Sequence, residues 1–162
     1  TPQESTTGWF NDKLKAKFGV IEDITDKGWI TNSYHVDIRE EIDAFTKLNI
    51  ESELQNFSTG GAVSYIETTP LYKNPKAVLK LFEHMYETII YSEINFESDV
   101  CGVCKYTGIM DCDKNTLDWV CPECGNKDQT KLSVVRRTCG YLGETTWTKG
   151  RKLDIINRVK HI

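Results

Sequence analysis

Four cysteines in the second half of the chain form two Cys-x-x-Cys pairs, separated by sixteen residues. The first pair is Cys101 and Cys104, and the second is Cys121 and Cys124. Two such pairs at this separation are typical of a structural zinc site, in which four thiolates surround one ion in a tetrahedron. A site closed by four protein ligands has no open coordination position, so the metal would stabilise the fold rather than take part in catalysis.

Two other interpretations of these cysteines stay open, namely a pair of disulfides or two redox-active dithiols. Nothing near the N-terminus resembles a secretory signal, and a reducing compartment favours a metal over disulfides. Cys112 lies between the two pairs and off their spacing. We interpret it as a spare thiol, which replaces a ligand only if one pair is distorted.

A second stretch that could do chemistry runs from Arg136 to Gly143 and reads Arg-Arg-Thr-Cys-Gly-Tyr-Leu-Gly. Two glycines three residues apart, after the strand-like run 131–135, usually mark a turn that needs a positive φ. The stretch also resembles the radical-bearing loop of glycyl radical enzymes, in the R-x-C-G-Y-L form of anaerobic (class III) ribonucleoside-triphosphate reductases. This resemblance implies that Gly140 carries an organic radical.

Glycine suits such a radical because loss of one Cα hydrogen leaves an electron that the flanking amide and carbonyl groups delocalise, and no Cβ prevents flattening. A radical on the backbone needs a separate agent to generate it. The resemblance implies an activating enzyme that uses S-adenosylmethionine and an iron–sulfur cluster. It also implies that Gly140 passes the radical to a cysteine elsewhere, whose thiyl removes a hydrogen from the substrate ribose. The adjacent Cys139 is not the expected acceptor, because neighbouring residues of an extended chain point to opposite sides.

The N-terminus predicts a helix that ends near Phe18, before Gly19. Thr1 is suited to the N-cap, Pro2 to the first helical position and Glu4 to closing a capping box. The apolar residues expected on one side are Trp9, Phe10, Leu14 and Phe18. A helix N-terminus attracts anions, and the T-P-x-E-S segment of the reductases approaches the active site. The resemblance therefore implies that Glu4 meets substrate phosphate or takes part in proton transfer, and a plain helix cap is the alternative.

Residues 26–36 read as a turn followed by a strand, because aromatic and β-branched side chains run through them. This segment resembles the T-N-S-Y/F-H stretch of the reductases. A lone histidine near a strand end is usually part of the hydrogen-bonded structure, and we interpret His35 in that way. Residues 39–55 have apolar side chains at loosely helical spacing, and their element type stays open.

The middle of the chain predicts a strand, a helix and a second parallel strand. Residues 59–67 combine a Gly-Gly turn with an apolar run, which suits a strand buried on both faces. Asn74 as cap and Pro75 at the first helical position begin the helix, and residues 91–96 form the next strand. The apolar stripe of the helix is Val78, Leu81, Phe82, Met85 and Ile89.

The last residues predict a closing helix from about Gly150 to His161, with Leu153, Ile156 and Val159 facing inward. A cluster of basic residues in this tail is expected to form the polar face of that helix, and contact with a nucleotide or an acidic partner is the alternative. The cluster consists of Lys149, Arg151, Lys152, Arg158, Lys160 and His161.

Composition excludes several classes of protein. The 162 residues are 39% hydrophobic and 27% charged, which is enough for one modest core and a metal-stabilised lobe, and no stretch approaches a membrane span. A net charge of −4 argues against broad binding to nucleic-acid phosphates. A zinc-ribbon module that binds nucleic acid stays an alternative, although the cysteine hairpin has more acidic than basic residues. They are Asp111, Asp113, Asp118 and Glu123 against Lys105 and Lys114.

The resemblance extends over nearly the whole chain, from T-P-x-E-S through T-D-K-G, T-N-S-Y-H, G-G-x-x-S-Y, the paired cysteines and R-R-T-C-G-Y-L-G to W-T-K-G-R-K and R-V-K-H. It implies an α/β fold, the C-terminal part of a ten-stranded α/β barrel of the glycyl radical enzyme type. Residues 1–98 would supply barrel segments, residues 99–130 a zinc-ribbon-like lobe, and residues 131–162 the glycyl radical loop and C-terminal helix.

The implied activity is conversion of ribonucleoside triphosphates to deoxyribonucleoside triphosphates for DNA synthesis, by a cytoplasmic enzyme that is a homodimer when full length. The family members are several times longer, and their upstream region holds the thiyl cysteine, most substrate contacts and the nucleotide effector site. We therefore expect a fragment or a split-gene subunit that needs the rest of the barrel, and no nucleotide reduction by these residues alone. A small glycyl radical subunit that rescues a larger enzyme is a further alternative.

Overall fold

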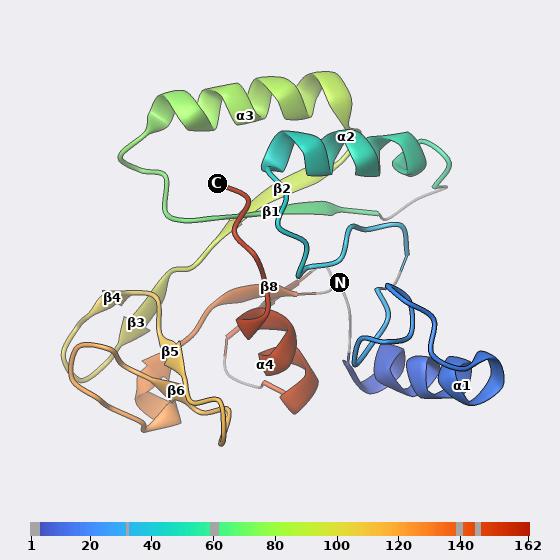
Figure 1. Cartoon of the computed structure of the whole chain (residues 1–162). Coiled ribbons are helices and arrows are strands. Elements are labelled where there is room, and N and C mark those ends of the chain that lie inside the picture. The colour runs from blue at the N-terminus through green and yellow to red at the C-terminus, as the bar shows by residue number, and fades with distance from the viewer. Residues whose placement is uncertain (1–3, 32, 59–61, 139–140, 145–146) are drawn as a thin grey trace.

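A computed structural model describes residues 4–31, 33–58, 62–138, 141–144 and 147–162 (Figure 1). The helices are η1 (Glu4–Gly8, π-helical), α1 (Trp9–Phe18), α2 (Ala44–Gln55), α3 (Pro75–Thr88), η2 (Gln129–Lys131, 3₁₀) and α4 (Lys149–Ile156). The strands are β1 (Ser64–Thr68), β2 (Ser92–Phe96), β3 (Asp99–Cys101), β4 (Thr107–Gly108), β5 (Asp111–Cys112), β6 (Trp119–Val120), β7 (Leu132–Ser133), β8 (Arg136–Thr138) and β9 (Tyr141–Gly143). The chain is therefore a mixed helix and strand structure.

The predicted strand, helix and parallel strand in the middle of the chain are confirmed as β1, α3 and β2. β1 pairs in parallel with β2 from Ser64 opposite Ser92 to Thr68 opposite Phe96. α3 begins where expected because Asn74 Oδ1 accepts a hydrogen bond from the Ala77 amide at 3.2 Å. Figure 1 shows α2 and α3 on one side of this sheet and β8 and α4 on the other. The core between the sheet and these helices consists of Ala44, Leu48, Ile66, Leu81, Met85 and Ile89.

α2 settles the open element in residues 39–55. Asp43 caps the helix, because its Oδ1 accepts hydrogen bonds from the amides of Phe45 at 2.9 Å and Thr46 at 3.1 Å. Unusually for a helix of this size, its buried face includes a charged pair, Lys47 and Glu51. The paired charges compensate for their burial, since an isolated buried charge is strongly unfavourable.

The strand predicted in residues 26–36 is wrong for the described part of that segment, which forms turns and irregular chain. The Val36 amide donates to Glu51 Oε1 at 2.9 Å, so a side chain takes the place of a neighbouring strand. His35 Nδ1 lies 3.5 Å from Glu51 Oε2. This contact agrees with a structural role for His35.

α1 ends at Phe18 as predicted, and Gly19 follows it with a φ of +79°. Its expected apolar side is not buried, since Trp9, Phe10 and Phe18 are each about half exposed. The residue that α1 buries is Asn11, whose Nδ2 donates to the Thr25 carbonyl at 3.3 Å. Thr1 and Pro2 of the predicted cap lie outside the described residues, as does the side chain of Glu4, the first residue of η1. The α1 N-cap is Gly8, which has no side chain to accept a hydrogen bond.

A small lobe of antiparallel strands follows β2. β3 pairs with both β4 and β7, and β5 pairs with β6. α4 packs against this lobe through Ile155 and Ile156, so the C-terminal helix and the cysteine region share one hydrophobic core. The buried members of this core are Cys101, Met110, Trp119, Cys121, Leu132, Val134 and Ile155.

The C-terminal tail differs from the prediction, because the closing helix ends at Ile156 and the last residues form a turn followed by irregular chain. The Val159 amide donates to the Ile38 carbonyl at 2.9 Å, and the His161 amide donates to the Glu67 carbonyl at 2.8 Å. The His161 carbonyl in turn accepts from Ala44, the first residue of α2, at 3.3 Å. Bonds to β1 and α2 thus replace the last helical turn.

None of the helices in the described ranges is long and apolar enough to cross a membrane. Among the described strands, β1 and β2 form the parallel pair and the others pair as antiparallel ribbons. Two parallel strands are compatible with a segment of a larger barrel, and the barrel itself stays a prediction.

The tail predicts a loss of stability in acid. Burial, with Lys47 nearby, lowers the pKa of His161 to about 4, and its Nδ1 accepts from the Glu67 amide at 2.9 Å. The unfolded histidine titrates near 6.5, so the unfolded chain binds more protons between about pH 6.5 and about pH 4, and stability falls as the pH drops through this window. We expect the thermal unfolding midpoint of the full-length protein to fall with pH there.

His161→Gln retains an acceptor for the Glu67 amide but removes the titration, so the fall between about pH 6.5 and about pH 4 should become shallower. A second loss of stability, which arises from protonation of Glu51, should persist in this variant below about pH 4.5. Although burial alone would raise it, His35 and Lys47 lower the pKa of Glu51 to about 2. An unchanged slope in His161→Gln across the upper window would contradict the prediction.

Candidate metal centre and loop anchorage

The four paired cysteines lie together in the small lobe. Their Sγ atoms are all within 4.8 Å of one another, with Cys101 to Cys124 at 3.8 Å and Cys104 to Cys121 at 3.6 Å. A tetrahedral ion with metal–sulfur bonds of about 2.3 Å requires sulfur atoms about 3.8 Å apart, whereas a disulfide requires about 2.05 Å. The cysteines of the described ranges are free thiols. The cluster can therefore bind one metal ion, and four sulfur donors favour zinc or iron.

The two Cys-x-x-Cys segments fold into the same loop. In each, the amide of the first cysteine donates to the carbonyl five residues later, and its carbonyl accepts from the amide four residues later. These bonds are Cys101 N to Tyr106 O at 2.9 Å, Lys105 N to Cys101 O at 2.9 Å, Cys121 N to Asn126 O at 3.0 Å and Gly125 N to Cys121 O at 2.9 Å. The residue after each pair has a positive φ, 65° at Lys105 and 70° at Gly125. The repeated turn brings the four sulfurs toward one point.

The local electrostatics favour a thiolate at Cys101, whereas desolvation and contacts with the other cysteine side chains outweigh the nearby backbone amides and raise the pKa of Cys104 and of Cys124. The backbone amides of Cys104 and Val103 lower the pKa of the Cys101 thiol to about 6. Cys101 and Cys121 are buried in the core of the lobe, whereas Cys124 is exposed. A metal here would fasten β3 to the loop after β6, in a lobe whose strands are only two or three residues long.

Cys112 does not belong to this cluster. It lies in β5 and packs against the hydrophobic core of the lobe. Burial raises the pKa of its thiol, which opposes metal binding because the ligand is the thiolate. The structure thus agrees with the interpretation of Cys112 as a spare thiol.

Cys139 and Gly140 lie outside the described residues, but the strands on either side of them are described. β8 and β9 pair antiparallel, with Thr138 opposite Tyr141. The two chain ends that flank the Cys139-Gly140 pair are therefore adjacent. At the other end of β9, a Cβ on Gly143 would lie 2.8 Å from the indole ring of Trp147, so this position needs glycine for close packing.

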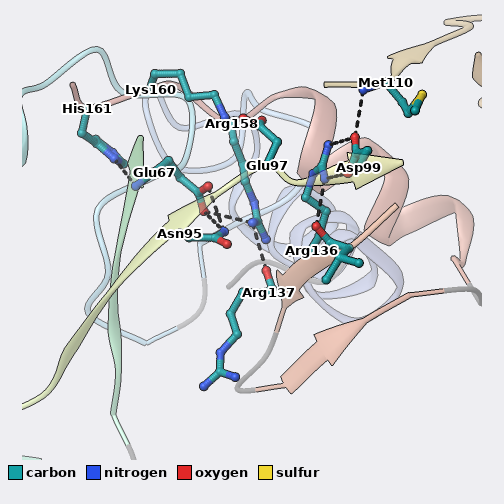
Figure 2. A network of polar contacts seen from close by, with 11 residues as sticks. Glu67, Asn95, Glu97, Asp99, Met110, Arg136, Arg137, Arg158, Lys160 and His161 are labelled. Carbon is teal, nitrogen blue, oxygen red and sulfur yellow. Dashed lines mark hydrogen bonds and ion pairs between the residues drawn. The ribbon is translucent and has the colours of Figure 1, made fainter. Parts of the chain in front are cut away.

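Arg136 joins β8 to the cysteine lobe (Figure 2). Its guanidinium forms a two-pronged ion pair with Asp99, in which Nη2 lies 2.7 Å from Oδ2 and Nη1 contacts Oδ1. Both side chains are buried, at 3% and 0% exposure. Asp99 also accepts from the Met110 amide at 2.8 Å and lies two residues before the metal-ligand candidate Cys101. The lobe and β8 are thus fastened by a buried charged contact.

Arg137 faces the parallel sheet instead. Its Nη2 lies 2.6 Å from Glu93 Oε1 on β2, while its carbonyl accepts from Arg158 Nη1 at 3.0 Å. Arg158 also contacts Glu67 of β1 at 2.9 Å and Asp154 of α4 at 2.8 Å. We call the side chains that fasten β8 in this way the loop clamp. They are Glu67, Glu93, Asp99, Arg136, Arg137, Asp154 and Arg158.

The loop clamp corrects the prediction for the basic tail. Arg158 and Lys160 do not line an outward helix face, because Arg158 contacts buried carboxylates and Lys160 pairs with Glu97. Burial raises the pKa of Asp154, and Arg158 opposes this effect. Sequence reasoning missed the acidic partners, which come from distant segments. The available signal was the pair Arg136-Arg137, since consecutive strand residues point to opposite faces and each needs its own partner.

Known proteins resemble the chain along its whole length. A family model described as "Anaerobic ribonucleoside-triphosphate reductase" matches residues 1–161. Proteins named anaerobic ribonucleoside-triphosphate reductase are similar: that of Haemophilus influenzae is 38% identical over 100% of this chain and 23% of its own length. The Escherichia coli protein is 33% identical over 100% of this chain and 23% of its own length. The Enterobacteria phage T4 protein is 36% identical over 99% of this chain and 27% of its own length. The chain thus spans about a quarter of the curated relatives that it matches.

A solved structure described as "Anaerobic ribonucleotide reductase" has a similar fold. It superposes with a TM-score of 0.60 over 89% of this chain and 20% of that chain, at 19% sequence identity. The likeness indicates that the fold of this chain is similar to part of a larger protein.

The cysteine cluster predicts one bound metal ion per chain, which depends on all four sulfurs. We expect Cys101→Ser and Cys124→Ser to lose the metal after dialysis against a chelator, because a hydroxyl is a poor ligand for this site. Metal content can be measured by inductively coupled plasma mass spectrometry on the full-length protein. Cys112→Ser is the matched control and should retain the metal. Full metal content in the Cys101→Ser or Cys124→Ser variant would contradict the assignment of ligands.

The buried pair predicts a strong effect on stability. Arg136→Met should lower the free energy of unfolding by about 3 to 5 kcal/mol, because it leaves Asp99 as an uncompensated buried charge. Adding Asp99→Asn removes that charge and retains an acceptor for the Met110 amide, so the double variant should be more stable than Arg136→Met alone. Urea denaturation measures the free energy of unfolding of the single and the double variant.

Lys131→Gln provides the surface comparison, since Lys131 lies 3.7 Å from Asp128 and the two side chains are 60% and 44% exposed. An exposed pair of this kind contributes about 0 to 1 kcal/mol. Equal losses in Lys131→Gln and Arg136→Met would show that burial of the Asp99 pair has no special effect.

Proposed function

The chain belongs to the anaerobic ribonucleoside-triphosphate reductase family, and from that premise we propose that it is the part of such a reductase that carries the glycyl radical. Gly140 is the proposed radical site, and Cys101, Cys104, Cys121 and Cys124 are the proposed ligands of a structural zinc ion. The complete enzyme would convert ribonucleoside triphosphates to deoxyribonucleoside triphosphates for DNA synthesis.

The observation that carries this proposal is the anchorage of β8 and β9 on both sides of the Cys139-Gly140 pair. A backbone radical needs a glycine, since a Cβ would hinder flattening of the radical centre. It also needs a fixed place, because transfer of a hydrogen atom requires the reacting groups to be in contact. The loop clamp supports such a place, since Arg136 and Arg137 fasten β8 to the lobe and to the parallel sheet.

In the proposed reaction sequence, a radical-activating enzyme that uses S-adenosylmethionine and an iron–sulfur cluster removes one Cα hydrogen atom from Gly140. Gly140 then takes a hydrogen atom from a cysteine thiol of the upstream region, and the resulting thiyl removes one from the substrate ribose. The residues of this chain orient the loop. The zinc ion, when bound, would stabilise the lobe that contributes Asp99 to the loop clamp.

The apolar surface of the parallel sheet supports a requirement for the rest of the enzyme. A groove of about 860 Å³ lies between α3 and β2. Its walls include the exposed side chains of Tyr72, Leu79, Phe82 and Phe96. Exposed apolar patches of this kind usually mark an interface. We propose that upstream segments cover this groove and complete the ten-stranded barrel, to which residues 1–98 contribute.

The remaining assignments follow from the same proposal. Residues 99–130 would form the zinc lobe and residues 131–162 the radical loop with its C-terminal helix. Glu4 would lie near the substrate. We expect a cytoplasmic homodimer that binds nucleotide effectors through its upstream region. The match to the family over residues 1–161 favours this function over a small rescue subunit or a nucleic-acid-binding zinc ribbon.

Electron paramagnetic resonance provides the test. After anaerobic activation of the full-length protein, we expect a doublet whose main splitting arises from the remaining α-hydrogen of Gly140. Gly140→Ala should abolish the doublet. Gly28→Ala is the matched control, because a Cβ at Gly28 meets no atom within 4 Å and the variant should retain the signal.

Air exposure gives an independent readout, since it should cut the activated chain at Gly140 and shorten it by roughly the last couple of dozen residues. The Gly140→Ala variant should stay intact. A doublet that persists in Gly140→Ala, or no signal from the activated wild-type protein, would refute the assignment.

A further inference from the structure

Arg158 connects three elements that are far apart in the chain. Its Nη1 donates to Glu67 Oε1 on β1 at 2.9 Å and to the Arg137 carbonyl on β8 at 3.0 Å, and its Nη2 donates to Asp154 Oδ2 on α4 at 2.8 Å. Figure 2 shows the guanidinium directed between Glu67 and the Arg137 carbonyl. Its side chain is 5% exposed. The tail that follows α4 thus reaches the strand that leads to Gly140.

The surroundings of Arg158 fix its side chain before it meets β8. Asn95 Nδ2 donates to both carboxylate oxygens of Glu67, at 2.8 and 2.9 Å, which orients that carboxylate toward Arg158. Asp154 lies one helical turn before Arg158 and is itself 3% exposed. A planar guanidinium can serve several acceptors in fixed directions, whereas a lysine ammonium is a point charge on a flexible stem. The arrangement of these acceptors therefore suits an arginine side chain better than a lysine.

The contact with the Arg137 carbonyl differs in kind from the other anchors of β8. The ion pairs to Asp99 and Glu93 are made by arginine side chains, so they restrict the β8 backbone only through the rotamers of those side chains. Arg158 instead binds the main chain of β8, three residues before Gly140 in the sequence. A charge-assisted bond to a carbonyl restricts the backbone directly.

We propose that Arg158 is a positioning residue for the glycine loop, acting through its hydrogen bond to the Arg137 carbonyl. Glu67 and Asp154 hold the guanidinium, and the guanidinium sets where β8 ends relative to β1. This inference rests on the proposed function, because it assigns to Arg158 the placement of the segment that contains Gly140. Its loss should impair formation of the radical while the metal site and the α2–α3 core stay intact.

Two substitutions in the full-length protein test the proposal. Arg158→Lys retains the charge and loses the planar fork, and Arg158→Ala removes both. Lys160→Gln is the matched control, because Lys160 lies in the same tail and its ion pair is with Glu97, which is not part of β8. Metal content should equal that of the wild type in all three, which separates a local effect from general unfolding.

Hydrogen exchange measured by mass spectrometry reports the position of the hairpin without any radical. In both Arg158 variants, the amides of β8 and β9 should exchange roughly tenfold faster or more, the factor expected for loss of one charge-assisted hydrogen bond. Peptides from α2 and α3 should exchange as in the wild type. In Lys160→Gln, exchange of the hairpin should not change.

The paramagnetic doublet reports the function of the same contact. Both Arg158 variants should give less radical per chain after anaerobic activation than the wild type or Lys160→Gln. Methylguanidinium added to Arg158→Ala should restore part of the doublet, because it supplies the missing fork, whereas methylammonium should not. This rescue is not expected if Arg158 only contributes to general stability.

The outcomes separate the two proposals. Absence of a doublet from the activated wild-type protein would overturn the proposed function, while the exchange measurement would still decide whether Arg158 holds β8. A normal doublet and normal hairpin exchange in both Arg158 variants would overturn the positioning role alone. If Arg158→Ala unfolds, the measurements on Arg158→Lys decide. A wild-type doublet and wild-type hairpin exchange in Arg158→Lys would then overturn the positioning role.

Discussion

A glycine has no side chain by which a fold can hold it, so the place of the proposed radical site, Gly140, would have to be set through the strands on either side. The chain meets this need with charged contacts at β8, where Arg136 is fastened to Asp99 and the Arg137 main chain to Arg158. Such contacts are directional, and an apolar contact would not fix the backbone so closely.

Burying these charges has a cost that the rest of the fold offsets. Each arginine is desolvated, so it needs carboxylates at hydrogen-bond distance, and those carboxylates need rigid supports. Asp99 is supported by the cysteine lobe and the Met110 amide, and Glu67 by β1 and Asn95. The lobe has very short strands and a core that it shares with α4. A metal at the four cysteines would give this support the stiffness that so few strand residues cannot supply.

Local patterns were sufficient wherever one segment carried its own signal. Asn74 and Pro75 placed the start of α3, and the glycine-bounded apolar run placed β1, because capping and burial patterns act within a few residues. The cysteine cluster followed from spacing alone. Predictions failed where a distant group intervened. Glu51 bonds the Val36 amide where a strand was expected, and β1 and α2 bind the tail where a helix was expected.

The sequence by itself determined the family, the metal-ligand candidates and the βαβ unit, since each depends on residue types at fixed spacing along the chain. Only the tertiary structure decided which carboxylates meet which arginines. Arg158 and Glu67 are 91 residues apart, and Arg136 and Asp99 are 37 apart. No periodicity spans such separations, and an arginine in a basic tail reads the same whether it faces water or a buried carboxylate. The packing of α4 and the tail against the sheet determines which carboxylates the arginines contact.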